Sequence, residues 1–299
     1  MYVTGAASSV KELFTAICNL FDSVGWTANV VAKDDDGSYS SVIYCGVGSG
    51  KDAIYVHLSR KEDSKHIIID SCAGYDINLS GFEQPGSLRQ WKKFIGNYEG
   101  TMPALSISDN QQFIYWLFLD SYRLIVICRM SIIYESMYLG FIDPIANERQ
   151  YPYPMYVAGN SLSTETWPST KAGSFAFPNN GTGWLRRADG TWRQFECTPY
   201  FPSISTKGSV FPYICGNKKL ISNYSEIDLV NQDNFLLIPL MLMTSDPTDV
   251  CGILRGCFWI SGTRDIDAER VLVYNGSSYI VFDTKSERGT NSYFCVKLE

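Results

Sequence analysis

The run Tyr151-Pro152-Tyr153-Pro154 constrains the fold of this chain more than any other short segment. Proline fixes its own φ angle and keeps the residue before it out of the helical region, so all four residues are expected to be extended. Backbone N–H groups two residues apart point to the same side of a strand, so Pro152 and Pro154 remove donors from one edge only. We therefore predict a rigid edge strand in which Tyr151, Tyr153 and Met155 share one face.

The rest of the sequence favours strands and turns over helices. Of the 299 residues 14% are aromatic and 19% are charged, and the chain has 24 glycines and 12 prolines, a composition typical of a turn-rich β protein. Tight-turn dipeptides predict hairpins at Asp189-Gly190 and Asn275-Gly276. Three adjacent apolar segments are expected to form an antiparallel meander: Gln112–Leu119, Arg123–Met130 and Ser131–Tyr138.

One helix is expected, near the N-terminus. Apolar residues follow a spacing of three and four through Thr4–Val24, Ser8 or Ser9 can cap the start, and Gly25 ends the pattern. The fold class is therefore mainly β with an N-terminal α-helix, with antiparallel sheets or a sandwich and long loops. We divide the chain into 1–160, a helix plus β meander, and 161–299, a β-rich C-terminal part; the two parts can also form one continuous domain.

Charge and hydropathy argue against two classes of partner. The formal net charge is −6 and no Lys/Arg-rich block offsets it, so we expect no nucleic acid, whose phosphates require clustered cations. The longest apolar run, Phe235–Met243, is interrupted by Pro239 and is far shorter than the ~20 residues that a bilayer requires. We therefore expect no membrane span.

The nine cysteines do not form a metal or redox pattern. They are scattered and contain no CxxC pair, unlike zinc or thioredoxin-type motifs. Most lie in apolar segments, so we interpret them as small buried apolar residues. Disulfides formed after cell lysis are the alternative.

Two segments resemble ligand-binding loops but match poorly. Gly46–Asp52 suggests a phosphate-binding loop, yet Lys51 is followed by an acid and then by a strand-like segment, so we predict a hairpin turn. The acidic run Asp34–Gly37 lacks the late glutamate of a calcium loop and is predicted to be a solvated turn, with a calcium site as the alternative.

The sequence contains no signature of an active site. His57 and His66 are its only histidines, and neither belongs to a known catalytic motif. We expect no enzymatic activity, no cofactor and no metal. A polysaccharide hydrolase with paired carboxylates stays open as a hypothesis, because the distance between two carboxylates in the folded chain cannot be read from a sequence.

A long segment from Ala73 to about Ser106 is predicted to be loop-like. It contains four aromatic residues, Phe82, Trp91, Phe94 and Tyr98. Loops of this length in a compact domain are usually functional or pack against a partner. These rings are expected to anchor the loop either to the core or to a neighbouring subunit, and both alternatives stay open.

Several short motifs resemble those of a family of tailed-bacteriophage virion structural proteins. The most extended is a strand ending in Tyr138-x-Gly140-Phe141, followed by a proline turn and the segment Gln150–Pro154. The others are Gly74-Tyr75-Asp76, Gln84-Pro85-Gly86, Trp116 with Arg123 in the meander, and Gly256-x-Phe258-Trp259-x-Ser261-Gly262. We expect Arg123 to brace backbone carbonyls or a carboxylate at its turn.

The resemblance implies a structural component of a tailed phage particle, a neck, collar or tail-associated protein that assembles as a homo-oligomeric ring. Its expected partners are other copies of itself and other neck or tail proteins (tube, sheath or connector), in a virion assembled in the host cytoplasm. Candidate subunit-interface residues are Phe82, Trp91, Phe94, Tyr98, Tyr151 and Tyr153. The alternative is a host-receptor or carbohydrate-binding virion surface module, in which Trp167, Trp184 and Trp192 stack on sugars.

Overall fold

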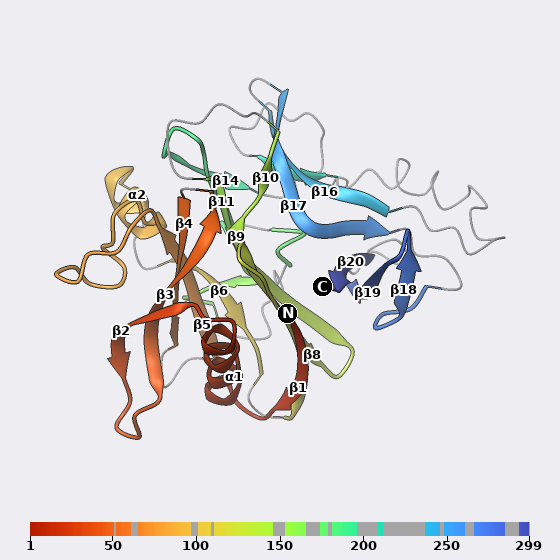
Figure 1. The fold of residues 1–299 in the computed structure, drawn as a ribbon, viewed down its shortest axis with the longest axis horizontal. Helices are drawn as coiled ribbons and strands as arrows, with labels where there is room; N and C mark the ends of the chain where they lie inside the picture. Colours follow the sequence, from red (N-terminus) through yellow and green to blue (C-terminus); the bar gives the residue numbers. More distant parts are fainter. Residues whose placement is uncertain are drawn as a thin grey trace.

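The described residues of the chain fold into three antiparallel sheets and two helices (Figure 1). The computed structural model describes residues 1–50, 52–60, 65–96, 101–108, 111–145, 153–165, 174–178, 181–195, 208–211, 237–245, 248–260, 266–284 and 293–298. The mainly β fold with antiparallel sheets that the sequence predicts is confirmed.

Each sheet is described by its strands in spatial order. Sheet A contains β1 (Tyr2–Ala7), β7 (Phe113–Leu119), β8 (Arg123–Met130), β9 (Ile133–Phe141), β11 (Met155–Ala158), β13 (Gly183–Arg186) and β14 (Trp192–Phe195). Sheet B contains β12 (Ser161–Leu162), β6 (Pro103–Ser106), β5 (His66–Cys72), β4 (Asp52–Arg60), β3 (Tyr39–Ser49) and β2 (Thr27–Lys33). Sheet C contains β15 (Ser209–Phe211), β16 (Leu237–Ser245), β17 (Thr248–Ile260), β20 (Tyr293–Leu298), β19 (Ser277–Asp283) and β18 (Val271–Tyr274), and β10 (Asp143–Pro144) pairs with β17.

Sheet A is the middle layer, and both of its faces are buried. In β8, Leu124 and Val126 belong to the core shared with sheet B, whereas Ile125 and Ile127 belong to the core shared with sheet C. Figure 1 shows sheet A between the orange strands of sheet B and the blue strands of sheet C. A strand buried on both faces reads as a continuous apolar run, which is why the predicted meander stands out in the sequence.

The N-terminal helix is present but starts later than predicted. Residues Tyr2–Ala7 form β1, which pairs with β7, and α1 spans Val10–Ser23. The Ser9 hydroxyl accepts a hydrogen bond from the Glu12 N–H at 3.2 Å, and the chain leaves the helix at Gly25 with φ of 79°. The prediction that Thr4 begins the helix is wrong because the free edge of β7 offers backbone partners that local helix propensity does not reveal.

The prediction that this strand lies at the edge of its sheet is also wrong. β11 pairs with β9 on one side and with β13 on the other, so Met155–Ala158 is an interior strand. Its ladder begins directly after Pro154, whose missing N–H therefore costs no strand hydrogen bond. Tyr153 does pack against the same core as Met155, as the alternation predicts, and Tyr151 and Pro152 lie outside the described residues.

Arg123 braces the contact between sheets A and C, which confirms its predicted role. Its Nε donates to Asp120 Oδ2 at 3.0 Å, and its Nη1 donates to the Arg255 carbonyl. The next residue, Gly256, has φ of 60°, and a Cβ there would lie 2.7 Å from Arg123 Nη2. Arg123 thus fills the irregular position of β17, between the parts that pair with β10 and with β20.

The segment from Ala73 to Ser106 is more ordered than a loop. It contains a second helix, α2 (Leu88–Phe94), and strand β6. The prediction of a single helix and of a long loop here is therefore wrong. Sheets A and B both take strands from either side of residue 160, and the division of the chain at that point stays a prediction.

The turns predicted in place of ligand loops are confirmed. β3 and β4 pair as far as Ser49 and Asp52, so the glycine-rich linker belongs to a hairpin. Two backbone hydrogen bonds close the acidic turn: the Asp34 N–H donates to the Ser38 carbonyl, and the Gly37 N–H donates to the Asp34 carbonyl. The Asp34 carboxylate pairs with Arg60. Among the described residues, no three His, Cys, Asp or Glu side chains gather as metal ligands would.

The seven cysteines in the described part of the chain form no disulfide with one another. Five are buried, and Cys45 and Cys251 are half-buried, so these seven match the predicted role as small apolar residues. Cys197 and Cys215 lie outside the described residues. Neither described helix is long and apolar enough to cross a bilayer.

Candidate interaction site

Residues 73–96 fold back over the face of sheet B that points away from sheet A, and we name them the α2 lobe. Ile69 and Leu58 of sheet B point into the core, so their strand neighbours Asp70 and His57 point to the outer face. There the His57 ring lies 4.3 Å from the ring of Phe82. The lobe therefore covers the buried polar side chains of the outer face.

Gln84 holds the first half of the lobe together. Its Oε1 accepts from the Asp76 N–H at 2.7 Å, and its Nε2 donates to the carbonyls of Asp76, Leu79 and Ser80 at 3.0–3.2 Å. The side chain is fully buried. One amide thus satisfies four backbone groups that a loop would otherwise leave to water.

Asp70 positions the start of α2. Its Oδ1 accepts from the N–H groups of Ser71 at 2.7 Å and of Leu88 at 3.0 Å. Ser87 caps the helix by accepting from the Gln90 N–H at 3.2 Å. Burial raises the pKa of the Asp70 carboxyl to about 7, against the opposing effect of these N–H donors and of Arg89.

Two contacts join the lobe to sheet A. The Trp192 Nε1 donates to the Gly86 carbonyl at 3.1 Å. The buried Lys92 donates to the Thr101 carbonyl and lies over the Trp184 ring, with its Nζ 5.5 Å from the ring centroid. Burial lowers the pKa of Lys92 to about 8. The lobe is therefore fixed to two of the three sheets.

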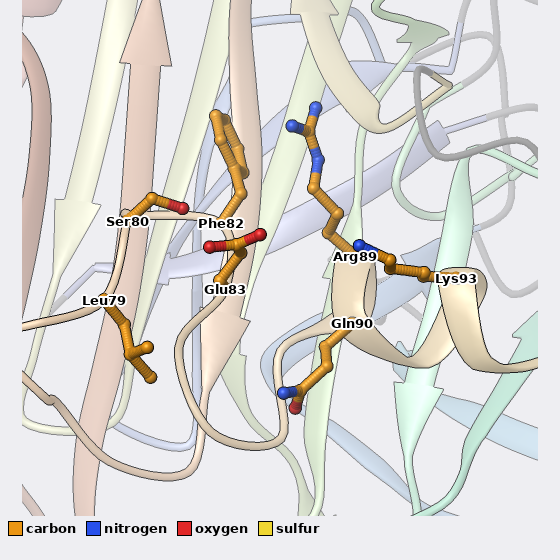
Figure 2. Close-up of a pocket in the computed structure, with 7 residues that line it drawn as sticks. All are labelled: Leu79, Ser80, Phe82, Glu83, Arg89, Gln90 and Lys93. Carbon is orange, nitrogen blue, oxygen red and sulfur yellow. The ribbon is translucent and has the colours of Figure 1, made fainter.

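An open groove of about 420 Å³ runs between the loop half of the lobe and α2, and we name it the α2 groove. Figure 2 shows its two walls, one from the loop and one from the helix. The Arg89 guanidinium lies 3.9 Å from the Phe82 ring centroid, so Phe82 is held between Arg89 and His57. The lining residues are Leu79, Ser80, Phe82, Glu83, Arg89, Gln90 and Lys93.

The predicted interface residues fall in different environments. Phe94 is 81% exposed, whereas Trp91 and Phe82 are half-buried against the core. Tyr153 is half-buried, with its ring 5.2 Å from that of Phe141. Tyr98 and Tyr151 lie outside the described residues. Of the four candidates that the structure describes, Phe82, Trp91 and Phe94 come together in the lobe, and Tyr153 does not.

Two of the three tryptophans expected to stack on sugars are not on the surface. Trp184 and Trp192 are buried in the core between sheets A and B. The Trp184 Nε1 donates to the Gly181 carbonyl at 2.8 Å. Trp167 lies outside the described residues.

The charged residues of the α2 groove were missed because α2 was interpreted as loop. Arg89 and Lys93 are four residues apart, so they share a face only if the segment is helical. The signal was present as Ser87-Leu88-Arg89-Gln90, which fits the Ser-x-x-Gln capping-box pattern at a helix start. Glu83 and Ser80 have no comparable signal, because the fold of the loop brings them opposite the helix.

The histidines do not make this region an acid–base site. His57 is buried, and its Nε2 lies 2.9 Å from the Ser41 hydroxyl. Burial, and secondarily the charge of Arg89, lowers its pKa to about 3. The imidazole is therefore neutral near pH 7, and Phe82 covers it. The exposed side chains of the α2 lobe are instead apolar and charged groups, such as Phe94 and Lys93.

Neither a protein-family model nor a curated protein matches this chain.

Proposed function

We propose that this protein is a structural component of a tailed phage particle, a neck, collar or tail-associated protein that assembles as a homo-oligomeric ring. The motif resemblance supports this proposal. Two of its motifs, Gly74-Tyr75-Asp76 and Gln84-Pro85-Gly86, meet in space through the Gln84–Asp76 hydrogen bonds. The two motifs thus belong to one hydrogen-bonded loop structure and are not two unrelated turns.

The observation that carries the proposal is the exposed apolar surface on the otherwise well-anchored α2 lobe. Phe94 and Ile77 are each 81% exposed, and Leu79 and Ile95 are exposed beside them in sequence. Exposed large apolar side chains on a rigid support are typical of protein–protein contact surfaces. The function that we propose for them is contact with another copy or with a neck or tail protein, without enzymatic activity.

The test combines solution size with location on the particle. We expect the purified full-length chain to show a mass of several subunits in light scattering coupled to size exclusion, rising with concentration. We also expect it among the proteins of purified particles by mass spectrometry. A monomer at high concentration that is also absent from particles would reject the proposal.

The second candidate is a host-receptor or carbohydrate-binding module on the virion surface. Because Trp184 and Trp192 are buried, this candidate no longer has those two rings as a stacking platform. The α2 groove, which is lined by both polar and apolar groups, favours it instead. A glycan array with no bound sugar would count against it.

A further inference from the structure

The lining of the α2 groove combines polar end groups with apolar stems and rings. Five of its seven lining residues are polar or charged: Ser80, Glu83, Arg89, Gln90 and Lys93. Leu79, Phe82 and the aliphatic stems of the longer side chains supply apolar surface beside these groups. The groove therefore suits a ligand that has both polar groups and an apolar face, and its volume lies in the range of small-ligand sites, about 300–1,000 Å³.

The charged groups of the groove are available for binding. Within the described residues, no ion pair or hydrogen bond engages the side-chain charges of Arg89, Lys93 or Glu83. The Arg89 Nε is buried and has no hydrogen-bond acceptor there, and a buried donor without a partner is energetically costly. An acceptor supplied by a ligand would relieve that cost.

We propose that the α2 groove binds a uronic acid residue of an acidic saccharide. The sugar carboxylate lies with Arg89 and Lys93, and the ring hydroxyls lie with Glu83, Ser80 and the Gln90 amide. The inference does not depend on the assembly of the protein into a ring.

Each chemical group of the proposed ligand is matched by a residue that lines the groove. A guanidinium binds a carboxylate through two parallel N–H donors, and stacking on Phe82 fixes the plane of that fork. Glu83 accepts hydrogen bonds from hydroxyls but repels a second carboxylate. The Gln90 Oε1 is already bonded to the Gly86 N–H at 3.2 Å, which leaves its NH₂ group as the donor. One carboxylate with the hydroxyls of the same sugar ring therefore fits this set, and any further carboxylate of a longer saccharide lies outside the groove.

The experiment is a calorimetric titration of the full-length protein with tetragalacturonic acid and with its methyl ester. The two compounds differ only at the carboxyl groups, which are anionic in the acid and are neutral, methylated groups in the ester. We expect heat of binding with the acid and none with the ester. Equal binding of both, or no binding of the acid at millimolar concentration, would overturn the proposal.

Variants locate the binding to the groove. We expect Lys93→Gln and Arg89→Gln each to weaken acid binding about tenfold or more, the loss typical of one charge-assisted hydrogen bond. The matched control is Lys33→Gln, which removes an exposed charge from β2 outside the groove and should leave the affinity unchanged. If Arg89→Gln disturbs folding, the affinity of Lys93→Gln is the deciding measurement, because Lys93 is exposed. Unchanged acid binding by Lys93→Gln would contradict the assignment of the site to the α2 groove.

A third probe separates a sugar from an acidic protein segment. Tetraglutamate carries the same number of side-chain carboxylates without ring hydroxyls. We expect Glu83→Gln to weaken galacturonate binding while tetraglutamate binds poorly to the wild type. An affinity for tetraglutamate equal to that for tetragalacturonic acid would assign the groove to an acidic peptide and overturn the saccharide proposal.

Discussion

Gln84 hydrogen-bonds both backbone groups of Asp76, accepting from its N–H at 2.7 Å and donating to its carbonyl at 3.0 Å. This pairing imitates one rung of a β-ladder with a side chain. Because the same amide also reaches the carbonyls of Leu79 and Ser80, it determines the shape of the loop wall of the α2 groove. Stability and binding surface are therefore coupled at one residue.

Replacement of Gln84 should loosen the loop without unfolding the sheets. Gln84→Leu removes four hydrogen bonds. The carbonyls of Asp76 and Ser80 keep the bonds that they accept from the N–H groups of Leu79 and Glu83, whereas the Asp76 N–H loses its Gln84 acceptor. We therefore expect the free energy of unfolding to fall by about 3 kcal/mol. Urea titration measures the loss, and amide exchange should rise within residues 76–84. Gln112→Leu is the matched control, because Gln112 is exposed; an equal loss in both variants would contradict the role of Gln84.

Asp70 should make the stability depend on pH. Its pKa is about 7 in the folded chain against an ordinary value of 3.8. A carboxyl whose pKa is raised on folding stabilises the folded chain. This contribution is complete at pH values below the pKa of the unfolded chain, and it is lost as the pH rises toward 7. We expect the free energy of unfolding of the wild type, relative to Asp70→Asn, to fall by about 1 kcal/mol per pH unit between pH 4 and 7.

Urea unfolding of both proteins at several pH values measures this difference. It should level off about one pH unit above the folded pKa of about 7, where the folded carboxyl is largely ionised. Asp35→Asn, a change of an exposed carboxylate in the acidic turn, is the control. A difference between wild type and Asp70→Asn that rises with pH would show that the N–H donors outweigh burial.

Arg123 should contribute more to stability than exposed arginines do. Arg123→Gln leaves the half-buried Asp120 carboxylate and the Arg255 carbonyl without their cationic partner, and we expect a loss of about 3 kcal/mol in chemical unfolding. Arg187→Gln is the comparison, since the Arg187–Asp189 pair is exposed and spans 3.9 Å. Its expected cost is below about 1 kcal/mol, and similar losses in the two variants would refute the bracing role.

The parts of the fold that could be predicted are those specified locally. Asn275-Gly276 has positive φ at both residues, as a tight hairpin turn requires, and its dipeptide is visible in the sequence. The interior strand Arg123–Met130 shows as one apolar run because both of its faces are buried. Neither feature depends on a distant partner for its sequence signal.

The parts that could not be predicted depend on pairing across the chain. Tyr2–Ala7 is a strand because Phe113–Leu119 lies beside it, and no local pattern indicates that partner. The proline run suggested an edge, yet the strand begins at the first residue after Pro154 that has an N–H to donate. In the candidate site, the aromatic rings of the lobe were identified from sequence, whereas the two walls of the groove required the fold.

Phe94 provides the most direct test of assembly through the α2 lobe. Its ring is 81% exposed and lies 5.7 Å from the ring of Trp91. If this surface contacts another copy, Phe94→Ser removes a buried aromatic contact worth about 2 kcal/mol or more and weakens self-association at least about tenfold.

Sedimentation equilibrium measures the change, with Ile132→Ser as the control. Ile132 is 85% exposed on the turn between β8 and β9. Its replacement therefore also removes a large exposed apolar side chain, but outside the α2 lobe. We expect the control to associate as the wild type does. Loss of association in Ile132→Ser with no effect of Phe94→Ser would move the contact surface from the α2 lobe to the β8–β9 turn.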